Sequence, residues 1–442
     1  MLPEYRVLDL KLEHLLQEEV RELQTERLKA QAHHCYENAP FWRRKFDKAG
    51  ITPDDIKTVE DLPKIPFCTK EDLQKDQEEN PPYGSYLCVH PSRLTQYMAT
   101  SGTTGRPVVR VFTQRDWDHI IQRFQRDPHL DPGEIVMVLG PTDGLMGPTA
   151  GVAGWSSLGA LVVKAARFST QDKVKLIHQL KPPFVIATAS FLLYLAEVAE
   201  QMDMAFPRMG GVRIVASVGE PGGAIPATRE RLLKSWGAKY VQDGYGITEL
   251  FPLGDSCQGS PSLHIANDFV ITEVIDTETG RVLGPGQRGE LVFTNIIGET
   301  QPLLRYRTRD VGAVAEFGPC PACGATSTRI VNGIEGRSDD MVWYKGINIF
   351  PTAVEAVVRS FDELSNEFEI VLDQKGTAQT LTIRAEVIPQ VAPDDYGRLG
   401  QQLGNRLLEA LEGVHAQVEL LPEGTLPKTQ YKGKRVKDNR PR

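Results

Sequence analysis

The sequence lacks the features that mark membrane-spanning, secreted and nucleic-acid-binding proteins. None of its apolar runs approaches the ~20 residues that a membrane-spanning helix requires. Six cysteines among 442 residues are too few for a disulfide framework, and the heavily charged stretch 1–27 leads us to expect no secretory signal. A formal net charge of −8 argues against general binding to nucleic acids or membrane surfaces. We therefore expect a cytoplasmic protein whose partners are small molecules.

A phosphate-binding motif of the Walker A type is also missing, but another candidate anion site is present. The stretch 97–108 reads Y-M-A-T-S-G-T-T-G-R-P-V and contains five small or hydroxylated residues in a row: Ser101, Gly102, Thr103, Thr104 and Gly105. The two glycines permit the positive φ angles that turn successive N–H groups toward one point, and such a nest favours phosphate. Short apolar stretches at 94–98 and 107–112 predict flanking strands. A flexible hairpin tip is the alternative interpretation.

The length exceeds what one hydrophobic core usually holds, so we expect two or more domains. Between residues 113 and 244 apolar strands alternate with helical patterns, which predicts βαβ units and a largely parallel sheet. The predicted strands are 134–140, 160–164, 184–188, 213–217 and 239–244, and the predicted helices are 113–126, 151–158, 171–180, 191–201 and 226–236. Ligands of such sheets bind beyond the carboxyl ends of the strands. The loops at Gly140, Thr188, Gly219 and Gly244 should therefore share one cleft.

The two ends of the chain have a different pattern. Before the nest we expect a helix over 9–38, ended by Pro40, and a short helix over 70–77. From about Asp268 the stretches 269–276 and 289–294 predict antiparallel strands, followed by a strand region over 342–351. The last hundred residues predict a small α+β unit with helices at 352–360 and 393–411 and strands at 367–373, 380–388 and 415–420. We expect the basic tail 424–442 to be exposed.

Two pairs of metal-binding residues lie in the β-rich region. Cys320 and Cys323 form a Cys-x₂-Cys pair, and Cys257 with His264 forms a Cys-x₆-His pair upstream. Sulfur and imidazole ligands of this number suit tetrahedral Zn²⁺, and four filled positions indicate a structural site rather than a catalytic one. Loop cysteines without a metal are the alternative. Cys35, Cys68 and Cys88 are expected to be ordinary thiols.

Seven segments in order carry a specific family resemblance. They are the nest, Gly219-Glu-Pro221, Tyr245-Gly-Ile-Thr-Glu249, the stretch 286–294 (G-Q-R-G-E-L-V-F-T), Tyr306-Arg-Thr-Arg-Asp310, the stretch 336–351 (G-R-S-D-D-M-V-W-Y-K-G-I-N-I-F-P) and the stretch 427–435 (P-K-T-Q-Y-K-G-K-R). Together they resemble the adenylate-forming enzymes, and most closely the phenylacetate–CoA ligase family. The stretches 34–46 and 188–197 also resemble that family, so the similarity runs nearly from end to end.

The resemblance implies an ATP-dependent acid–CoA ligase that forms an acyl-adenylate and then passes the acyl group to coenzyme A. It implies roles for individual residues. Ser101 to Gly105 would hold the β- and γ-phosphates, Thr248 would contact the α-phosphate and Glu249 would bind Mg²⁺. Gly219, Glu220, Pro221, Asp243, Tyr245 and Gly246 would surround the adenine, and Asp310 would accept hydrogen bonds from the ribose.

The resemblance also implies an α/β N-terminal domain over 1–336, which includes the β-rich part and the zinc knuckle, and a mobile α+β domain over 337–442. The hinge would be Asp339, and Arg337 would face the nucleotide after closure. Lys432 matches the lysine used for adenylation, although Tyr431 replaces the usual preceding glycine and leaves Lys434 as an alternative. Lys345 and Gly346 belong to a loop that would line the thiol channel.

The identity of the acid is open at this stage. We expect its pocket among 140–150, 187–191 and 217–220, with apolar walls from Leu145, Met146, Trp155 and Phe191. The first loop reads Asp143-Gly-Leu-Met, whereas phenylacetate ligases carry more aromatic residues there, so an aryl or arylacetic acid other than phenylacetate fits the resemblance. The alternatives are loading of a carrier protein, amide formation, AMP transfer as in F390 synthetases, and a catalytically silent nucleotide-binding protein. The oligomeric state is open, with a homodimer as one expectation.

Overall fold

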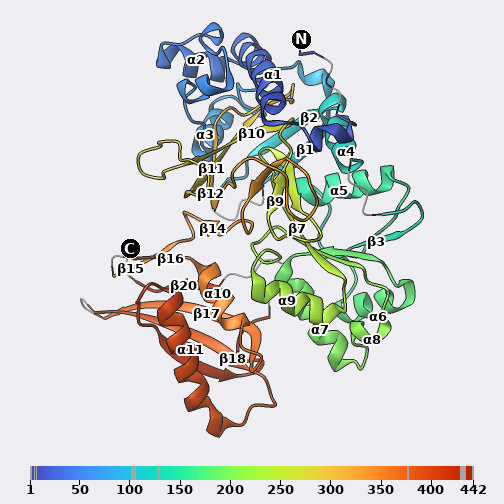
Figure 1. The fold of residues 1–442 in the computed structure, drawn as a ribbon, viewed down its shortest axis with the longest axis vertical. Coiled ribbons are helices and arrows are strands. Elements are labelled where there is room, and N and C mark those ends of the chain that lie inside the picture. Colours follow the sequence, from blue (N-terminus) through green and yellow to red (C-terminus); the bar gives the residue numbers. More distant parts are fainter. Residues whose placement is uncertain are drawn as a thin grey trace. The chain divides into compact units, whose positions relative to one another are not determined.

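A computed structural model describes residues 2, 3, 5, 7–100, 106–126, 130–345, 347–375, 378–428 and 435–440. The chain divides into two compact units, each built from two separate stretches of sequence. The first unit comprises Met1–Ala166 and Gly244–Val331, and the second comprises Arg167–Asp243 and Asn332–Arg442. Figure 1 shows the elements of both units and labels many of them. The mixed α/β architecture predicted from the sequence is confirmed.

The first unit begins with helices and a β-hairpin. Threonines start two of its helices: Thr69 Oγ1 accepts the Asp72 N–H at 3.2 Å and Thr113 Oγ1 accepts the Asp116 N–H at 3.3 Å, which satisfies backbone donors that the helix itself leaves unpaired. The elements up to residue 166 are η1 (Leu10–Glu13), α1 (Gln17–Asn38), α2 (Pro40–Ala49), η2 (Pro53–Asp55), η3 (Val59–Lys64), α3 (Lys70–Glu79), η4 (Pro91–Arg93), β1 (Leu94–Ala99), β2 (Val109–Thr113), α4 (Gln114–Phe124), β3 (Ile135–Val138), α5 (Met146–Ser157) and β4 (Leu161–Lys164).

The remainder of the first unit consists of strands. It contains β8 (Phe251–Ser256), β9 (Leu263–Ile265), β10 (Val270–Ile275), β11 (Arg288–Asn295), β12 (Tyr306–Ala313), β13 (Thr328–Ile330) and the second half of β7 (Tyr240–Ile247). Strands β3 and β4 pair in parallel. The pairs β7–β8, β8–β9 and β9–β13 are antiparallel, as are β10–β11 and β11–β12.

A buried ion pair joins three segments of this unit. The Arg126 guanidinium donates to both carboxylate oxygens of Asp268, at 2.9 and 2.6 Å, and each side chain is 1% exposed. The same guanidinium donates to the Glu13 carboxylate at 3.0 Å and to the Val7 carbonyl at 2.7 Å. Arg126 therefore fastens the N-terminal segment to the connection between β9 and β10.

The second unit contains two groups of elements. The first group is α6 (Thr170–Leu180), β5 (Phe184–Ala187), α7 (Ala189–Gln201), α8 (Phe206–Met209), β6 (Ile214–Val218) and α9 (Pro226–Trp236). Strands β5 and β6 pair in parallel, with Ala187 opposite Ser217. The second group is β14 (Gly336–Arg337), β15 (Val342–Tyr344), β16 (Ile347–Ile349), α10 (Pro351–Arg359), β17 (Leu364–Lys375), β18 (Ala378–Val387), η5 (Pro393–Asp395), α11 (Tyr396–Ala410), β19 (Gln417–Pro422) and β20 (Val436–Asp438).

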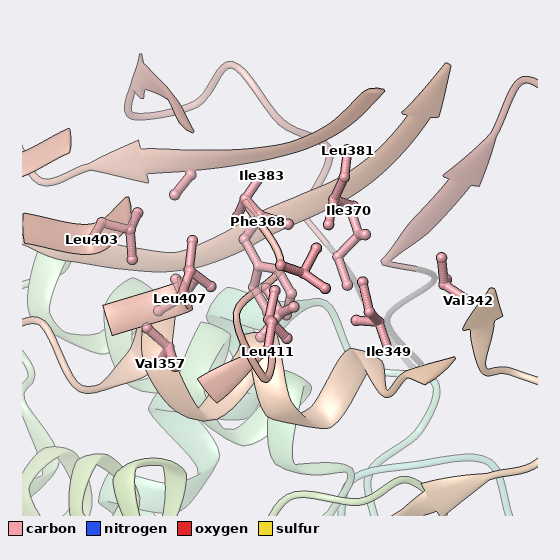
Figure 2. Close-up of a cluster of buried hydrophobic side chains, with 14 of the residues drawn as sticks. Val342, Ile349, Val357, Phe368, Ile370, Leu381, Ile383, Leu403, Leu407 and Leu411 are labelled. Carbon is pink, nitrogen blue, oxygen red and sulfur yellow. The ribbon is translucent and has the colours of Figure 1, made fainter. Parts of the chain in front are cut away.

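The C-terminal group has its own hydrophobic core. Its four-stranded sheet has the order β19-β18-β17-β20, and α10 and α11 pack on this sheet (Figure 1). Figure 2 shows apolar side chains from the helices meeting those from the strands, and Phe368 lies among them with an exposed fraction of 1%. Leu399, Leu403 and Leu407 recur every four residues along α11 and are fully buried, which is the helical spacing that places one face on a sheet.

Most predicted elements are confirmed, and three predictions are wrong in part. The expected helix over 9–38 begins at Gln17, because Leu10–Glu13 forms a separate 3₁₀ turn. The expected helix over 151–158 begins five residues earlier, at Met146. The tail is not exposed throughout, because Val436 to Asp438 pairs in parallel with β17 and Val436 packs against the C-terminal core. Pro40 ends the first helix and also starts the next, since proline suits the first position of a helix.

Among the described residues, no helix is both long enough and apolar enough to cross a membrane.

We predict that Phe368→Ala destabilises the C-terminal core by about 3–5 kcal/mol, because a fully buried ring leaves a cavity that its neighbours fill only in part. Urea unfolding followed by circular dichroism should show a lower midpoint. Gln401→Ala, an exposed substitution on α11, should leave the midpoint unchanged. An unaltered midpoint for Phe368→Ala would contradict the packing described here.

Candidate active site

Two strands fix the ends of the predicted phosphate loop. Strands β1 and β2 are antiparallel, with Ala99 opposite Val109, as the flanking sequences predict. The Thr100 N–H donates to the Val108 carbonyl at 3.0 Å, and the Val108 N–H donates to the Thr100 hydroxyl at 2.9 Å. The loop residues Ser101 to Gly105 lie outside the described part of the chain, so their predicted role stays a prediction.

A hydrogen bond joins two of the sequence motifs in the first unit. The Tyr245 hydroxyl donates to Asp310 Oδ2 at 2.6 Å, although the residues are 65 positions apart. Tyr245 lies on β7 and Asp310 on β12, where Asp310 is 5% exposed and its N–H donates to the Thr308 hydroxyl. Tyr245, one of the residues predicted to surround the adenine, and the predicted ribose-binding carboxylate are therefore neighbours.

The predicted magnesium ligand Glu249 is a buried carboxylate with two polar neighbours. Lys70, from the first turn of α3, places its Nζ 3.5 Å from Glu249 Oε1. Burial raises the pKa of the Tyr306 phenol well above its ordinary value, and the charge of Glu249 and a hydrogen bond to it add to the rise. Tyr306 is therefore a stable hydrogen-bond donor to Glu249.

The backbone near these residues adopts rare conformations. Phe251 has φ 119° two residues after Glu249, and Arg309 has φ 66° immediately before Asp310. Non-glycine residues in this region are strained, and such strain is concentrated at functional sites. At Gly246 a Cβ atom would lie 2.8 Å from Pro252 Cα, so this predicted adenine-site residue has to be glycine for β7 and β8 to approach.

The second unit carries another part of the predicted site, beyond the carboxyl ends of β5 and β6. Glu220 Oε1 accepts the Ser190 N–H at 2.7 Å, at the start of α7. The Ser217 hydroxyl donates to Asp243 Oδ1 at 2.6 Å. Gly219 has φ 87°, which turns the chain sharply between Val218 and Glu220. The loops at Thr188 and Gly219 thus lie at one edge of the paired strands, as expected.

The predicted hinge aspartate is paired with a predicted site residue. Arg337 donates to both oxygens of Asp339, at 2.9 and 3.0 Å. Lys345 occupies the turn between β15 and β16 with φ 48°, and its Nζ lies 5.0 Å from the centre of the Tyr344 ring. Gly346 and Lys432 lie outside the described residues, as does the alternative Lys434. Their roles remain predictions.

The residues predicted to line the acid pocket occupy both units. In the first unit Met146 starts α5 and is buried, and Gly144 accepts the Ala99 N–H at the end of β1. Trp155 packs edge to face on Phe124. Asp143 is exposed. In the second unit Phe191 is buried beside Tyr194.

The four predicted metal ligands converge in the first unit. The ligand atoms of Cys257, His264, Cys320 and Cys323 all lie within 4.8 Å of one another. Cys257 Sγ and Cys320 Sγ are 4.0 Å apart, and Cys323 Sγ is 3.9 Å from His264 Nε2. Two sulfurs bound to one tetrahedral zinc with bonds of ~2.3 Å are about 3.8 Å apart. The other imidazole nitrogen, Nδ1, lies 3.1 Å from the Ser327 hydroxyl, so Nε2 faces the thiols.

The thiols of this cluster differ in acidity. Burial raises the pKa of Cys320, but N–H groups of Ala322 and Cys323 and the neighbouring thiols outweigh it, so its pKa lies below the ordinary value. Burial and the charge of Cys257 raise the pKa of Cys323. Thiols that share one site lose their protons in sequence, and a bound metal would ionise them together.

The sequence did not predict Lys70 and Tyr306 individually as site residues. Lys70 was predicted only as part of the helix over 70–77, and Tyr306 only as part of the motif 306–310. A signal for Lys70 was available: a lysine in the first turn of a helix opposes the helix dipole. A lysine at this position makes the helix itself less stable, which suggests that its side chain serves a contact outside the helix. Tyr306 offered no comparable signal, because buried tyrosines are common in strands.

Comparison with known protein families agrees with this geometry. The family described as AMP-binding enzyme matches residues 21–296, and the family described as AMP-binding enzyme C-terminal domain matches residues 346–440. The fold and the site thus define an adenylate-forming enzyme.

Individual relatives show which family of adenylate-forming enzymes the chain belongs to. The phenylacetate–coenzyme A ligase of Aromatoleum evansii is 32% identical over 441 residues, which is 98% of this chain and 97% of that protein. The same enzyme of Escherichia coli (strain K12) is 30% identical, over 96% and 95% of the two chains. The chain belongs to the phenylacetate–CoA ligase family. It is an AMP-forming acid–CoA ligase, which uses ATP to activate a carboxylic acid and forms an acyl-CoA.

Solved structures of 2-hydroxyisobutyryl-CoA ligase are also similar. One, in the postadenylation state in complex with R3-HIB-AMP, gives a TM-score of 0.90 with 28% identity, covering 97% of this chain and 92% of that chain. Another, in the thioesterification state with 2-HIB-AMP and CoA, gives a TM-score of 0.70 with 30% identity, covering 97% and 91%.

We predict that Tyr245→Phe raises the KM for ATP about tenfold, because a buried carboxylate at Asp310 loses a charge-assisted hydrogen bond. Initial-rate kinetics with varied ATP should show this increase with a smaller change in kcat. Tyr36→Phe is the matched control, since the Tyr36 hydroxyl donates to the exposed Asp47 carboxylate at 2.9 Å. An unchanged KM for Tyr245→Phe would contradict the role of this pair.

Proposed function

We propose that the acid activated by this acid–CoA ligase is an aryl or arylacetic acid. The site used in this proposal rests chiefly on the Tyr245–Asp310 hydrogen bond, which connects two motifs of the family. Its support for the acid class is the similarity to phenylacetate ligases over almost the whole chain. The loop Asp143-Gly-Leu-Met146 lacks the aromatic residues of the matching loop in phenylacetate ligases, which favours an acid other than phenylacetate itself.

In this proposal the chain's residues act mainly by positioning and by stabilising negative charge, since the transition state of adenylation is anionic. Ser101 to Gly105 hold the β- and γ-phosphates, and Thr248 contacts the α-phosphate. Asp310 binds the ribose hydroxyls and Tyr245 stacks on the adenine. Gly219, Glu220, Pro221, Asp243 and Gly246 complete the adenine site, and Arg337 approaches the nucleotide.

A magnesium ion is part of the proposal. Glu249 supplies a carboxylate oxygen, the ligand type that Mg²⁺ prefers together with phosphate oxygens. Lys70 and Tyr306 both contact that carboxylate and orient it. When bound, the metal neutralises charge on the ATP phosphates. A cytoplasmic location and a homodimer remain predictions.

We also propose a structural zinc in the cluster of Cys257, His264, Cys320 and Cys323. The spacing of the ligand atoms fits a tetrahedral site, and the four protein ligands would fill it. Zinc there would fasten the 320–323 knuckle to the strands β9 and β13, which pair beside it.

Two successive states of the enzyme follow from the proposed reaction, one for adenylation and one for thioester formation. A relative has been solved in a postadenylation and in a thioesterification state. We propose that this chain alternates in the same way, with the boundary at 336/337, the hinge at Asp339, Lys432 used for adenylation and the 345–346 turn used in the second half-reaction.

A panel of carboxylic acids, assayed for pyrophosphate release with and without coenzyme A, tests the proposed substrate class. Aryl or arylacetic acids should give pyrophosphate and, with coenzyme A, a thioester. The panel should include phenylacetate and 2-hydroxyisobutyrate. Acid-dependent pyrophosphate without a thioester would support carrier loading or amide formation, and a preference for short aliphatic acids would contradict the proposed class.

We predict that Lys432→Ala slows acyl-adenylate formation by about a hundredfold or more, since it removes a charge placed on the transition state. Thioester formation from supplied acyl-adenylate should change little. Lys434→Ala is the control and should affect neither step strongly. A normal adenylation rate for Lys432→Ala, with loss in Lys434→Ala, would transfer the role to Lys434.

We predict that the purified protein contains one zinc per chain and that Cys323→Ser lowers the zinc content at least severalfold, because a neutral hydroxyl is a poor zinc ligand. Elemental analysis measures the metal, and thermal unfolding should show a lower Tm for the variant and for chelator-treated protein. Cys88→Ser, outside the cluster, should keep its zinc. Carefully purified wild-type protein without zinc would contradict the site.

A further inference from the structure

An acidic residue of α7 binds the C-terminal part of the second unit. Glu197 Oε2 accepts a hydrogen bond from Lys428 Nζ at 2.9 Å, and Glu197 Oε1 accepts one from Asn366 Nδ2. The side chains of Lys428 and Glu197 are 24% and 21% exposed, so water screens the ion pair only in part. Burial lowers the pKa of Lys428, but the Glu197 carboxylate outweighs it and the pKa lies above the ordinary lysine value.

Lys428 lies close to the predicted adenylation lysine in the sequence, which connects the ion pair to the reaction. Lys428 immediately precedes the stretch 429–434, which contains Lys432. Two residues upstream, the Leu426 N–H donates to the buried Glu386 carboxylate. Downstream, Arg435 pairs with Glu367, and the Ile370 N–H donates to the Arg435 carbonyl at 2.7 Å. The described residues on both sides of this stretch are therefore hydrogen-bonded, and Glu197 supplies one of these contacts from α7.

Arg231 of α9 strengthens the same connection. Its Nε donates to the Arg359 carbonyl at 2.7 Å, its Nη1 donates to Asn366 Oδ1 at 3.0 Å, and its Nη2 donates to the Leu364 carbonyl at 3.1 Å. The Arg359 carbonyl lies in the last turn of α10, where helices leave acceptors unpaired and favour a cation. Asn366 thus contacts both Glu197 and Arg231.

These bonds are polar and can be exchanged for bonds to water. Contacts of that kind suit segments that separate and return, whereas permanent contacts are more often apolar. A reaction with two successive states requires such a reversible contact at the segment that carries the adenylation lysine.

We propose that Glu197 is a positioning residue for adenylation: its ion pair with Lys428 favours the state of the enzyme that forms acyl-adenylate, and this ion pair breaks before thioester formation. This inference rests on the proposed two-state reaction. It adds to that proposal Glu197 of α7, the last residue of the stretch 188–197, as a residue that favours one half-reaction over the other.

Charge reversal and restoration test the proposal. The two rates are pyrophosphate release in a single turnover with ATP and acid, and thioester formation from supplied acyl-adenylate with coenzyme A. The acid is the panel member that wild-type enzyme turns over fastest. Glu197→Lys and Lys428→Glu should each slow the first rate about tenfold, as loss of one partly buried ion pair implies, and leave the second within about twofold. The double variant, which restores an ion pair of reversed polarity, should recover most of the first rate.

Two further variants complete the design. Glu200→Lys makes the same charge change at an exposed position of α7 and should leave both rates unchanged. Glu197→Gln preserves size and should show the same selective loss to a smaller degree, even where the reversed charge prevents folding. Equal slowing of both rates, no slowing, or no recovery in the double variant would overturn the proposal. Wild-type enzyme that releases no acid-dependent pyrophosphate would instead contradict the proposed function.

Discussion

Within the first unit, the buried ion pair between Arg126 and Asp268 is the constraint on which much else depends. A charge at 1% exposure is stable only when its hydrogen-bonding groups are satisfied. Arg126 meets this condition by binding Asp268, Glu13 and the Val7 carbonyl together. The N-terminal segment is thereby held against the connection between β9 and β10. His264, a proposed zinc ligand, lies on β9, so the same region of the unit supports the cluster.

The same physical rule recurs at the candidate site. Asp310 is buried and bonded to Tyr245, and Glu249 is buried beside Lys70 and Tyr306. Each carboxylate is oriented by a donor or a cation nearby, and carboxylate oxygens are the groups that bind ribose hydroxyls or a divalent metal. In the second unit Asp243 and Glu220 are held by Ser217 and by the Ser190 N–H. The predicted ligand-binding groups are therefore oriented before any ligand arrives, which lowers the entropy lost on binding.

The sequence predicted the local structure best where the periodicity was long. The helices over 170–180 and 226–236 and the strands around β5 and β6 are confirmed to within one or two residues at most ends. It failed at residues 9–16 and at 436–438. Those stretches are short, and their conformation depends on partners elsewhere: Asp9 accepts the Lys11 N–H in an isolated turn, and Val436 needs β17 as a partner. Such nonlocal pairing leaves no periodic pattern in the stretch itself.

By itself the sequence determined the family, the ordered motifs, the four metal-ligand candidates and the alternation of helices and strands, because these depend on residue identity and spacing. Tertiary structure decided which of those residues meet. The 65 positions between Tyr245 and Asp310, and the 63 between Cys257 and Cys320, are spanned only when strands pair. Lys70 and Tyr306 became neighbours of Glu249, and Glu197 became a partner of Lys428, for the same reason. A contact between distant residues is a property of the folded chain, since its geometry depends on every element packed between them.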